Sequence, residues 1–376
     1  MNHTRKLVII GSTHHNTYSM VRCFSESGIK PDVILYGKSD SYILQSVFIN
    51  DSHVAPDATG ALRLLQDCYS EAVVIACTDE IASMMDLQYD GLNTKYDFFN
   101  CGATGKLTHF MDKAVQSRLA SEVGFPVPDF VEGKPGEIRV KRLHYPCIIK
   151  PLESIHGGKN LQICKHEDEL PAVLSAFDTN EKVLVQEFVK KDYEIVIVGL
   201  SYEDKVVIPA YVHKYRDTKG GTTYSAIKPV SFLPKEVLMS CKKMVKTMCY
   251  KGLFGIELIR RGNDYYFVEI NLRNDATTYA ICVAGCNLPL SFWKICNRES
   301  ADNFLAAPIR TINSMVEFND FIHVLKRDVS IRTWKRQWKE AECKYCYSKA
   351  DARVYRSQKK DFVKFVIKMM ITHLYS

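Results

Sequence analysis

The stretch "YYFVEINLRND", residues 265–275, decides the fold. It alternates as a β-strand does, and successive strand side chains point to opposite faces. One face is apolar and is expected to be core: Tyr266, Val268, Ile270 and Leu272. The other face lines up an acid, an amide and a guanidinium: Phe267, Glu269, Asn271 and Arg273. A surface strand whose charges merely pair with one another is the plainer alternative, but so apolar a stretch favours a binding surface.

The overall composition is that of an ordinary globular protein. The chain has 376 residues, of which 46% are apolar and 25% charged, and this length predicts two or three domains. It contains no run of 18 apolar residues, so no transmembrane helix is expected, and the four apolar residues near its start are too few for a signal peptide. Thirteen cysteines without a disulfide-like framework fit a reducing compartment, so we expect a cytoplasmic protein.

The first hundred residues predict a parallel sheet. Apolar strands at 6–10, 28–37 and 71–80 alternate with helical segments. Ligands gather at the carboxyl ends of such strands, where His15, Asn16 and Asp79 stand. The G-x-G-x-x-G fingerprint is absent after the first strand, which argues against a nicotinamide cofactor there.

Further along, one helix is predicted over about 109–123, ended by Gly124. Strands are predicted at 145–151, 182–189 and 193–202, and a hairpin joins 254–261 to 265–273. The segment 214–230 is polar and glycine-rich and is interpreted as an insertion between strands.

Four of these segments, in this order, resemble the ATP-grasp superfamily from about residue 106 to about residue 300. They are "MDKAVQSRLASEVGFPVP", "CIIKP", "VLVQEFVKKDYEI" and "FGIELIRRGNDYYFVEINLR". The resemblance is to carboxylate–amine (amino acid) ligases and to proteins like carbamoyl-phosphate synthase. It implies an α/β fold with three parts: a Rossmann-like pre-ATP-grasp domain over 1–105, a two-lobed ATP-grasp domain with antiparallel sheets over 106–300, and a basic C-terminal extension over 301–376. A lid subdomain is expected at about 120–190.

The resemblance also implies ATP and Mg²⁺ (or Mn²⁺) as cofactors. Magnesium prefers carboxylate and other oxygens, so Glu257, Glu269 and Asn271 are the expected metal ligands. Arg273, which cannot ligate a cation, is expected to hold the acyl phosphate or its transition state as a catalytic residue.

The resemblance also implies that the nucleotide contacts the other segments quoted above. Lys113 and Lys150 are implied to contact its phosphates, and Lys150 is also assigned a catalytic role. The glycine-containing loop that includes His156, Gly157 and Gly158 is expected to close over the phosphates. Glu187 and the backbone of Phe188 and Val189 are implied to meet the adenine, and Glu194 the ribose hydroxyls, which need only acceptors there.

The hairpin register tests this interpretation. Glu257 and Glu269 must point to one face to share metal ions. With a two-residue turn at Gly262 and Asn263, Glu257 would oppose Val268 and point away. We therefore predict either a three-residue loop, 262–264, or a bulge with the same effect.

The resemblance implies an ATP-dependent carboxylate–amine ligase, which forms an amide through an acyl phosphate and releases ADP and phosphate. Its partners would be a small-molecule carboxylate and an amine, with His15, Asn16, Asp79 and Arg216 as substrate contacts. The alternatives are a carboxylase acting through carboxyphosphate and a catalytically silent ATP-binding regulator.

The C-terminal segment is basic. From Lys326 to Ser376 it holds 14 Lys and Arg against 5 Asp and Glu, an excess of nine, whereas the rest of the chain is near neutral. No nucleic-acid-binding module accompanies these charges, so no nucleic acid is expected. A terminal helix over 359–376 is expected to dock on the body, and the alternative is peripheral membrane contact.

Overall fold

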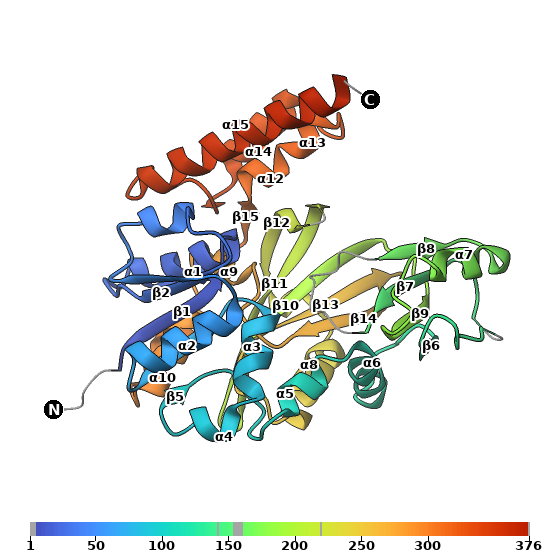
Figure 1. Ribbon diagram of the computed structural model, residues 1–376, viewed down its shortest axis with the longest axis horizontal. Helices are drawn as coiled ribbons and strands as arrows, with labels where there is room; N and C mark the ends of the chain where they lie inside the picture. Colours follow the sequence, from blue (N-terminus) through green and yellow to red (C-terminus); the bar gives the residue numbers. More distant parts are fainter. Residues whose placement is uncertain (1–4, 141–142, 153–160, 219, 375–376) are drawn as a thin grey trace.

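A computed structural model describes residues 5–140, 143–152, 161–218 and 220–374 (Figure 1). The expected α/β architecture is confirmed: a parallel sheet precedes two antiparallel ones. A large core runs through most of the molecule, from Leu7 on the first strand to Val354 near the C-terminus.

The N-terminal sheet has five parallel strands in the order β3-β2-β1-β4-β5. Its strands are β1 Leu7–Ser12, β2 Asp32–Tyr36, β3 Ser52–Ala55, β4 Ala72–Ala76 and β5 Tyr96–Asp97. Its helices are α1 His15–Ser25, η1 Tyr42–Gln45, α2 Ala58–Cys68, α3 Asp79–Asp86 and α4 Tyr89–Leu92. Because β1 and β4 are neighbours, the loops at their carboxyl ends lie side by side.

The central sheet has seven strands in the order β14-β13-β10-β11-β12-β15-β16. They are β10 Tyr193–Tyr202, β11 Lys205–Thr218, β12 Gly221–Pro229, β13 Gly252–Arg261, β14 Asp264–Asn271, β15 Ile312–Met315 and β16 Cys343–Lys344. The interpretation of 214–230 as an insertion was wrong. This stretch forms much of the β11–β12 hairpin, whose polar and aromatic residues pair across two strands with register shifts near Arg216.

A smaller antiparallel sheet, in the order β6-β9-β7-β8, lies at one end of the molecule (green in Figure 1). It consists of β6 Phe130–Gly133, β7 Cys147–Pro151, β8 Gln162–Cys164 and β9 Val183–Glu187, with η2 Glu167–Glu169 and α7 Leu170–Leu174. Its apolar residues, from Ile138 to Val185, form a core separate from the main one. This sheet lies within the range 120–190, for which the lid subdomain stays a prediction.

The single helix predicted over 109–123 is two helices, α5 Lys106–Phe110 and α6 Lys113–Glu122. The carboxylate of Asp112 accepts hydrogen bonds from the N–H groups of Ala114 and Val115, and this N-cap starts the second helix. Gly124 ends it with a φ of 101°, as predicted. Lys113 therefore occupies the first position of α6.

The helices between β12 and β15 are η3 Val230–Phe232, α8 Lys235–Thr247, α9 Thr278–Ala284, α10 Leu288–Cys296 and α11 Asp302–Leu305. Within the described ranges, no single helix is long and apolar enough to span a membrane; α9 and α10 reach that composition jointly but bend by 96°.

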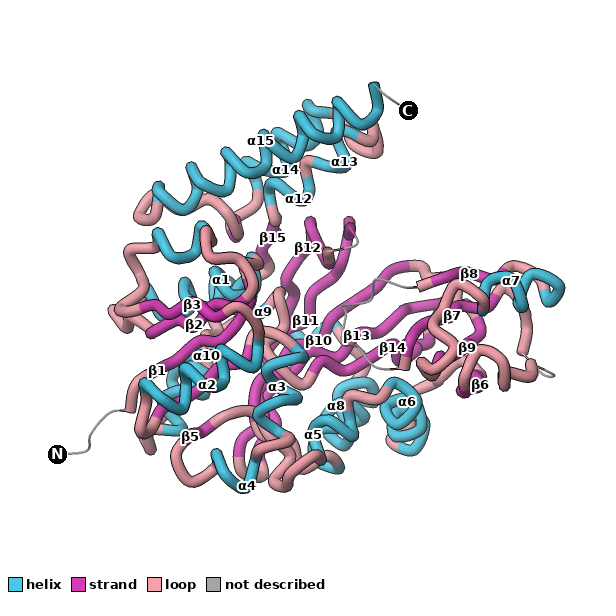
Figure 2. Tube along the Cα trace, viewed as in Figure 1, coloured by secondary structure: helices cyan, strands magenta, loops and turns pink. Residues whose placement is uncertain are grey.

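The C-terminal segment is built into the body. Strands β15 and β16 extend the edge of the central sheet, and α12 Glu317–Asp320, α13 Ile322–Leu325, α14 Ile331–Glu340 and α15 Ala352–Leu374 form a helical layer beside it (Figure 2). The buried carboxylate of Asp351 accepts hydrogen bonds from Tyr18 and Ser46 of the N-terminal domain. The start of α15 is docked, since Val354 is fully buried, but Val354 lies before the helix expected over 359–376. Within that range the side chains of Val363, Phe365 and Ile367 are exposed.

Candidate active site

The β13–β14 hairpin brings the two expected metal-binding glutamates together. Its turn has two residues, because Arg261 pairs with Asp264, so the predicted three-residue loop is wrong. The predicted alternative, a bulge, is present: Leu258 pairs with Phe267 and Glu257 with Glu269, leaving Val268 as the extra residue. Glu257 and Glu269 are thus direct cross-strand partners on one face.

The same bulge corrects the expected strand faces. Upstream of it Tyr265 and Phe267 are buried, and downstream Ile270 and Leu272 are buried, so the apolar face changes parity at Val268. Tyr266 and Val268 were predicted to be core and are only partly buried. A strict period of two cannot anticipate an inserted residue.

Two lysines approach this acidic pair. Lys150, at the end of β7, and Lys113 are both buried. The pKa of Lys150 is lowered to about 8, because burial and the charge of Lys113 together outweigh the opposing effect of Glu269 and Glu257. The Nζ of Lys113 donates to the carbonyl of Pro151 at 3.2 Å, which ties α6 to the end of β7. The structure therefore gathers positions 113, 150, 257 and 269.

Lys214, on β11, was not predicted from the sequence. Its Nζ lies 2.6 Å from Oε2 of Glu257 and 3.4 Å from Oε2 of Glu194. Burial by itself lowers the pKa of Lys214, but Glu257 and Glu194 raise it more, so the ammonium stays charged. The interpretation of 214–230 as an insertion concealed this residue, because its partners Glu194 and Glu257 lie on other strands of the central sheet.

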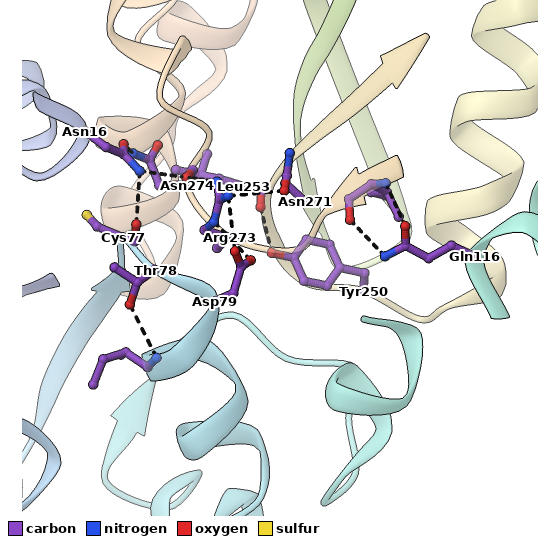
Figure 3. A network of polar contacts seen from close by, with 12 residues as sticks. Asn16, Cys77, Thr78, Asp79, Gln116, Tyr250, Leu253, Asn271, Arg273 and Asn274 are labelled. Atoms are coloured by element: carbon purple, nitrogen blue, oxygen red, sulfur yellow. Dashed lines mark hydrogen bonds and ion pairs between the residues drawn. The ribbon is translucent and has the colours of Figure 1, made fainter. Parts of the chain in front are cut away.

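Arg273 lies at the carboxyl end of β14 and forms a two-point ion pair with Asp79 (Figure 3). Its Nε and Nη2 donate to the two oxygens of Asp79 at 3.0 and 3.3 Å, and Nη2 also donates to Oδ1 of Asn271 at 3.2 Å. Asp79 begins α3, so this pair joins the N-terminal domain to the hairpin. The structure brings Arg273, Asn271 and Asp79 together.

Asn16 forms a second link between the same two parts (Figure 3). Its Nδ2 donates to the carbonyls of Cys77 and Asn274 at 3.0 and 3.2 Å, and its Oδ1 accepts from Nδ2 of Asn274. The side chain of Asn16, which is expected to contact substrate, therefore forms its hydrogen bonds with protein groups. His15 is buried against Tyr345, with ring centroids 5.7 Å apart, and burial holds its pKa well below its ordinary value.

Gln116 of α6 was also missed. Its Nε2 donates to the carbonyl of Ile270 and its Oε1 accepts from the N–H of Ile270, both at 3.0 Å (Figure 3). A side-chain amide has both a donor and an acceptor and can satisfy both groups of one residue. These two hydrogen bonds hold the helix that carries Lys113 against the strand that carries Glu269.

The expected adenine segment follows β9. Oε1 of Glu187 accepts from the N–H of His144 at 2.8 Å, and the N–H of Phe188 donates to the carbonyl of Pro146. The ring of Phe188 is exposed and Val189 is partly buried. Glu194 accepts from Lys191 at 2.7 Å as well as from Lys214, and these lysines outweigh its burial and lower its pKa.

Arg216 lies elsewhere. Its Nε and Nη2 donate to the fully buried carboxylate of Asp320 at 3.0 and 2.7 Å, and its guanidinium stacks over the ring of Tyr224. It joins the β11–β12 hairpin to α12. The expected phosphate contacts His156, Gly157 and Gly158 lie outside the described residues.

The donor set suits a divalent cation bound together with phosphate. Two carboxylates on facing strands and an amide two residues along supply hard oxygen ligands. In the part of the chain that the structure describes, no group of three or more His, Cys, Asp or Glu could hold a metal ion by itself. Such a site is typical of magnesium that takes its other ligands from a nucleotide and from water.

Comparisons with known proteins agree with this geometry. Residues 118–288 match the ATP-grasp domain family. Among curated proteins, the formate-dependent phosphoribosylglycinamide formyltransferase of Wolinella succinogenes is 28% identical over 172 residues, which are 43% of this chain and 43% of the relative. The enzyme of that name from Sulfurisphaera tokodaii is 28% identical over 179 residues, with 43% and 45% covered. The alignments thus span about half the length of these relatives.

Solved structures share the fold over most of the chain. N5-carboxyaminoimidazole synthetase from Staphylococcus aureus, complexed with ADP, superposes with a TM-score of 0.67 at 14% identity and covers 87% of each chain. An L-amino acid ligase from Bacillus licheniformis superposes with a TM-score of 0.62 at 13% identity, covering 84% of this chain and 80% of the ligase.

The part of the chain that matches the family model, residues 118–288, contains the β13–β14 hairpin with Glu257 and Glu269. Residues 118–288 match the ATP-grasp domain, and the solved structures named above share the fold of the chain.

Proposed function

We propose that this protein is an ATP-dependent carboxylate–amine ligase that works through an acyl phosphate. The carboxylates of Glu257 and Glu269, paired across one hairpin and faced by the buried Lys113 and Lys150, are the observation that carries the proposal. This combination suits a magnesium-bound polyphosphate, because the carboxylates would bind the metal ion and the lysines would bind the phosphates. The ligase class of the similar structures supports the same assignment.

In the proposed reaction, a carboxylate oxygen of the first substrate attacks the γ-phosphorus of ATP. The bond from that phosphorus to the β–γ bridging oxygen breaks and ADP leaves. The nitrogen of an amine then attacks the acyl carbon, the bond from that carbon to the phosphate oxygen breaks, and inorganic phosphate leaves. The amine loses a proton, so the products are an amide, ADP and phosphate.

Each residue then has a physical task. Glu257, Glu269 and Asn271 would hold magnesium, which shields the phosphate charges when bound. Lys113 and Lys150 would contact the phosphates. Arg273, held in orientation by Asp79 and Asn271, would stabilise the negative charge that develops on the acyl phosphate. Glu187 and the backbone at Phe188 and Val189 would bind adenine, and Glu194 the ribose.

The test is an ADP-release screen with purified protein, ATP and Mg²⁺ against pairs of carboxylates and amines. Release that requires both substrates, with an amide identified by mass spectrometry, supports the ligase. Release with bicarbonate and one amine, giving a carbamate, favours the carboxylase alternative. ATP binding with no release for any pair favours a silent regulator.

A membrane contact is a second proposal. On the distal half of α15 the side chains of Val363, Phe365 and Ile367 are exposed, and Lys359, Lys360 and Lys364 lie among them. Apolar and basic side chains together suit an anionic lipid surface. Co-sedimentation with phosphatidylserine vesicles should fall in Val363→Asp/Ile367→Asp, and equal sedimentation of both proteins would exclude the contact.

A further inference from the structure

A cavity of about 620 Å³ lies where three parts of the chain meet. The loop after β1, the tip of the β11–β12 hairpin, and the helices α12, α13 and α15 all line it. The loop includes Thr13 and His14, and α1 follows with His15 and Asn16. The Nδ2 of Asn16 donates to the carbonyl of Asn274, next to Arg273. The charge of Arg273 also acts on His14. The cavity therefore lies beside the proposed phosphoryl-transfer centre.

The wall away from Arg273 is aromatic. Tyr42, Phe318, Phe362 and Phe365 line it, and the rings of Phe318 and Phe362 stack with centroids 5.2 Å apart. Among the described lining residues, the Lys, Arg, Asp and Glu side chains number two: the positive Lys326 and the negative Asp361. Burial lowers the pKa of His14 to about 4, so this ring is neutral near pH 7. A net-neutral, aromatic wall does not suit a phosphorylated ligand, whose phosphate carries about −1.5 to −2 charges.

Two polar atoms of the lining are unsatisfied. The Oγ1 of Thr13 and the Oε1 of Gln358 are buried without a hydrogen-bond partner in the described part of the chain, and Gln358 is 94% buried, with 6% exposed. An unpaired buried acceptor costs about 1–3 kcal/mol. Because an amide oxygen only accepts, a ligand that satisfies Gln358 must offer an N–H or O–H donor.

The cavity is also preformed. The carboxylate of Glu317 accepts from the N–H groups of Cys346 and Tyr347, both at 2.8 Å, and the guanidinium of Arg22 donates to the carbonyls of Lys344 and Tyr345. With the contacts of Asp351, these bonds fix the C-terminal helices to the N-terminal domain. A rigid wall selects ligands by shape.

We propose that this cavity binds one of the two organic substrates, and that this substrate is an unphosphorylated small molecule with an aromatic or branched apolar body and a hydrogen-bond donor, as in an aromatic or branched-chain amino acid. The inference rests on the proposed ligase function and adds its substrate class. The apolar body packs against Phe318 and Phe362, the donor meets Gln358, and the reacting group points toward Arg273. This class differs from the phosphoribosyl compound in the names of the curated relatives.

Binding is measured without turnover, by thermal shift and calorimetry on the full chain. The probes are L-phenylalanine, L-leucine, glycine and ribose 5-phosphate. The expected result is a rise in Tm with L-phenylalanine or L-leucine that exceeds the rise with glycine and ribose 5-phosphate. Gln358→Leu should weaken that binding about tenfold, the loss of one hydrogen bond of about 1.4 kcal/mol. Val363→Ser, on the exposed side of the same helix, should bind as the wild type does.

A larger shift with ribose 5-phosphate, no shift with either apolar amino acid, or unchanged binding in Gln358→Leu would each overturn the inference. A parallel ADP-release assay separates the two proposals. Apolar ligands that bind but never stimulate release leave the cavity assignment standing and defeat the ligase. Release that requires both organic substrates to be phosphorylated supports the ligase and defeats the cavity assignment.

Discussion

Lys214 joins Glu257 to Glu194, with its ammonium 2.6 Å from the first carboxylate and 3.4 Å from the second. The lysine thus connects the acid proposed for magnesium with the acid proposed for ribose. We predict that Lys214→Met lowers the free energy of unfolding by roughly 2 kcal/mol, because two partly buried carboxylates lose their cation.

The same variant should gain more thermal stability from Mg-ADP than the wild type does, since the bound cation replaces part of the lost charge. Lys205→Met, at the exposed start of the same strand, is the matched control. Urea denaturation and thermal shift measure both effects. A wild-type free energy of unfolding in Lys214→Met would show that the bridge contributes nothing.

Glu269→Gln and Glu257→Gln should each reduce ATP turnover at least 100-fold. Each change removes one anionic oxygen from a site that needs at least two to hold magnesium on a phosphate. Asp264→Asn, an exposed acid at the turn of the same hairpin, should keep wild-type turnover. Turnover is measured as ADP release, with circular dichroism to check folding. Comparable rates in all three variants would rule out the metal assignment.

The pH dependence of nucleotide binding should report on Lys150. Its pKa of about 8 means that the free protein loses this charge above pH 8, whereas the bound phosphates favour the protonated form. The Kd for Mg-ATP should therefore be flat below pH 8 and rise, by at most tenfold per pH unit, above it. Calorimetry between pH 6.5 and 9.5 measures this.

The matching variant is Lys150→Arg, whose charge persists throughout this range, so its Kd should stay flat. In the nucleotide-free protein the sign for stability is opposite. Between pH 8 and about 10.5 the folded state holds fewer protons at Lys150 than the unfolded chain, so this group's contribution to stability rises with pH. A wild-type Kd that does not change across pH 8 would exclude Lys150 from phosphate binding.

Arg216 should be a structural residue. Arg216→Met leaves the fully buried Asp320 without its guanidinium and should cost about 3–5 kcal/mol of stability. Arg216→Met/Asp320→Asn should recover part of this, because no buried charge remains. If Arg216 instead clamps a carboxylate substrate, the single variant would raise the KM for that substrate without lowering the urea midpoint.

The elements that were predicted well are those in which local pattern and tertiary packing agree. The strand 193–202 is apolar and buried over its middle, from Ile195 to Leu200, and Gly124 ended its helix as a left-handed residue should. The register of Glu257 and Glu269 followed from a chemical requirement: two acids that share one ion must share one face.

The failures have identifiable physical causes. The bulge at Val268 inserts one residue and shifts the strand's parity, which no alternation rule contains. The segment 214–230 looks like a loop in isolation, because its polar residues are satisfied by partners far along the chain, such as Asp320 for Arg216. Lys214 and Gln116 act through contacts with residues 43 and 154 positions away, so no local pattern could have indicated them.

The separate core of the small sheet has a consequence for the energetics of closure. If that sheet moves on nucleotide binding, its buried side chains, such as Cys147, Ile149 and Val185, would stay packed among themselves. A cluster of three buried residues, Ala114, Leu152 and Leu184, lies where β7 and β9 meet α6. Heat capacity follows the apolar area that changes its exposure to water. Movement of this part on nucleotide binding would therefore add little to the heat capacity change, and the van 't Hoff plot for binding should be close to a straight line.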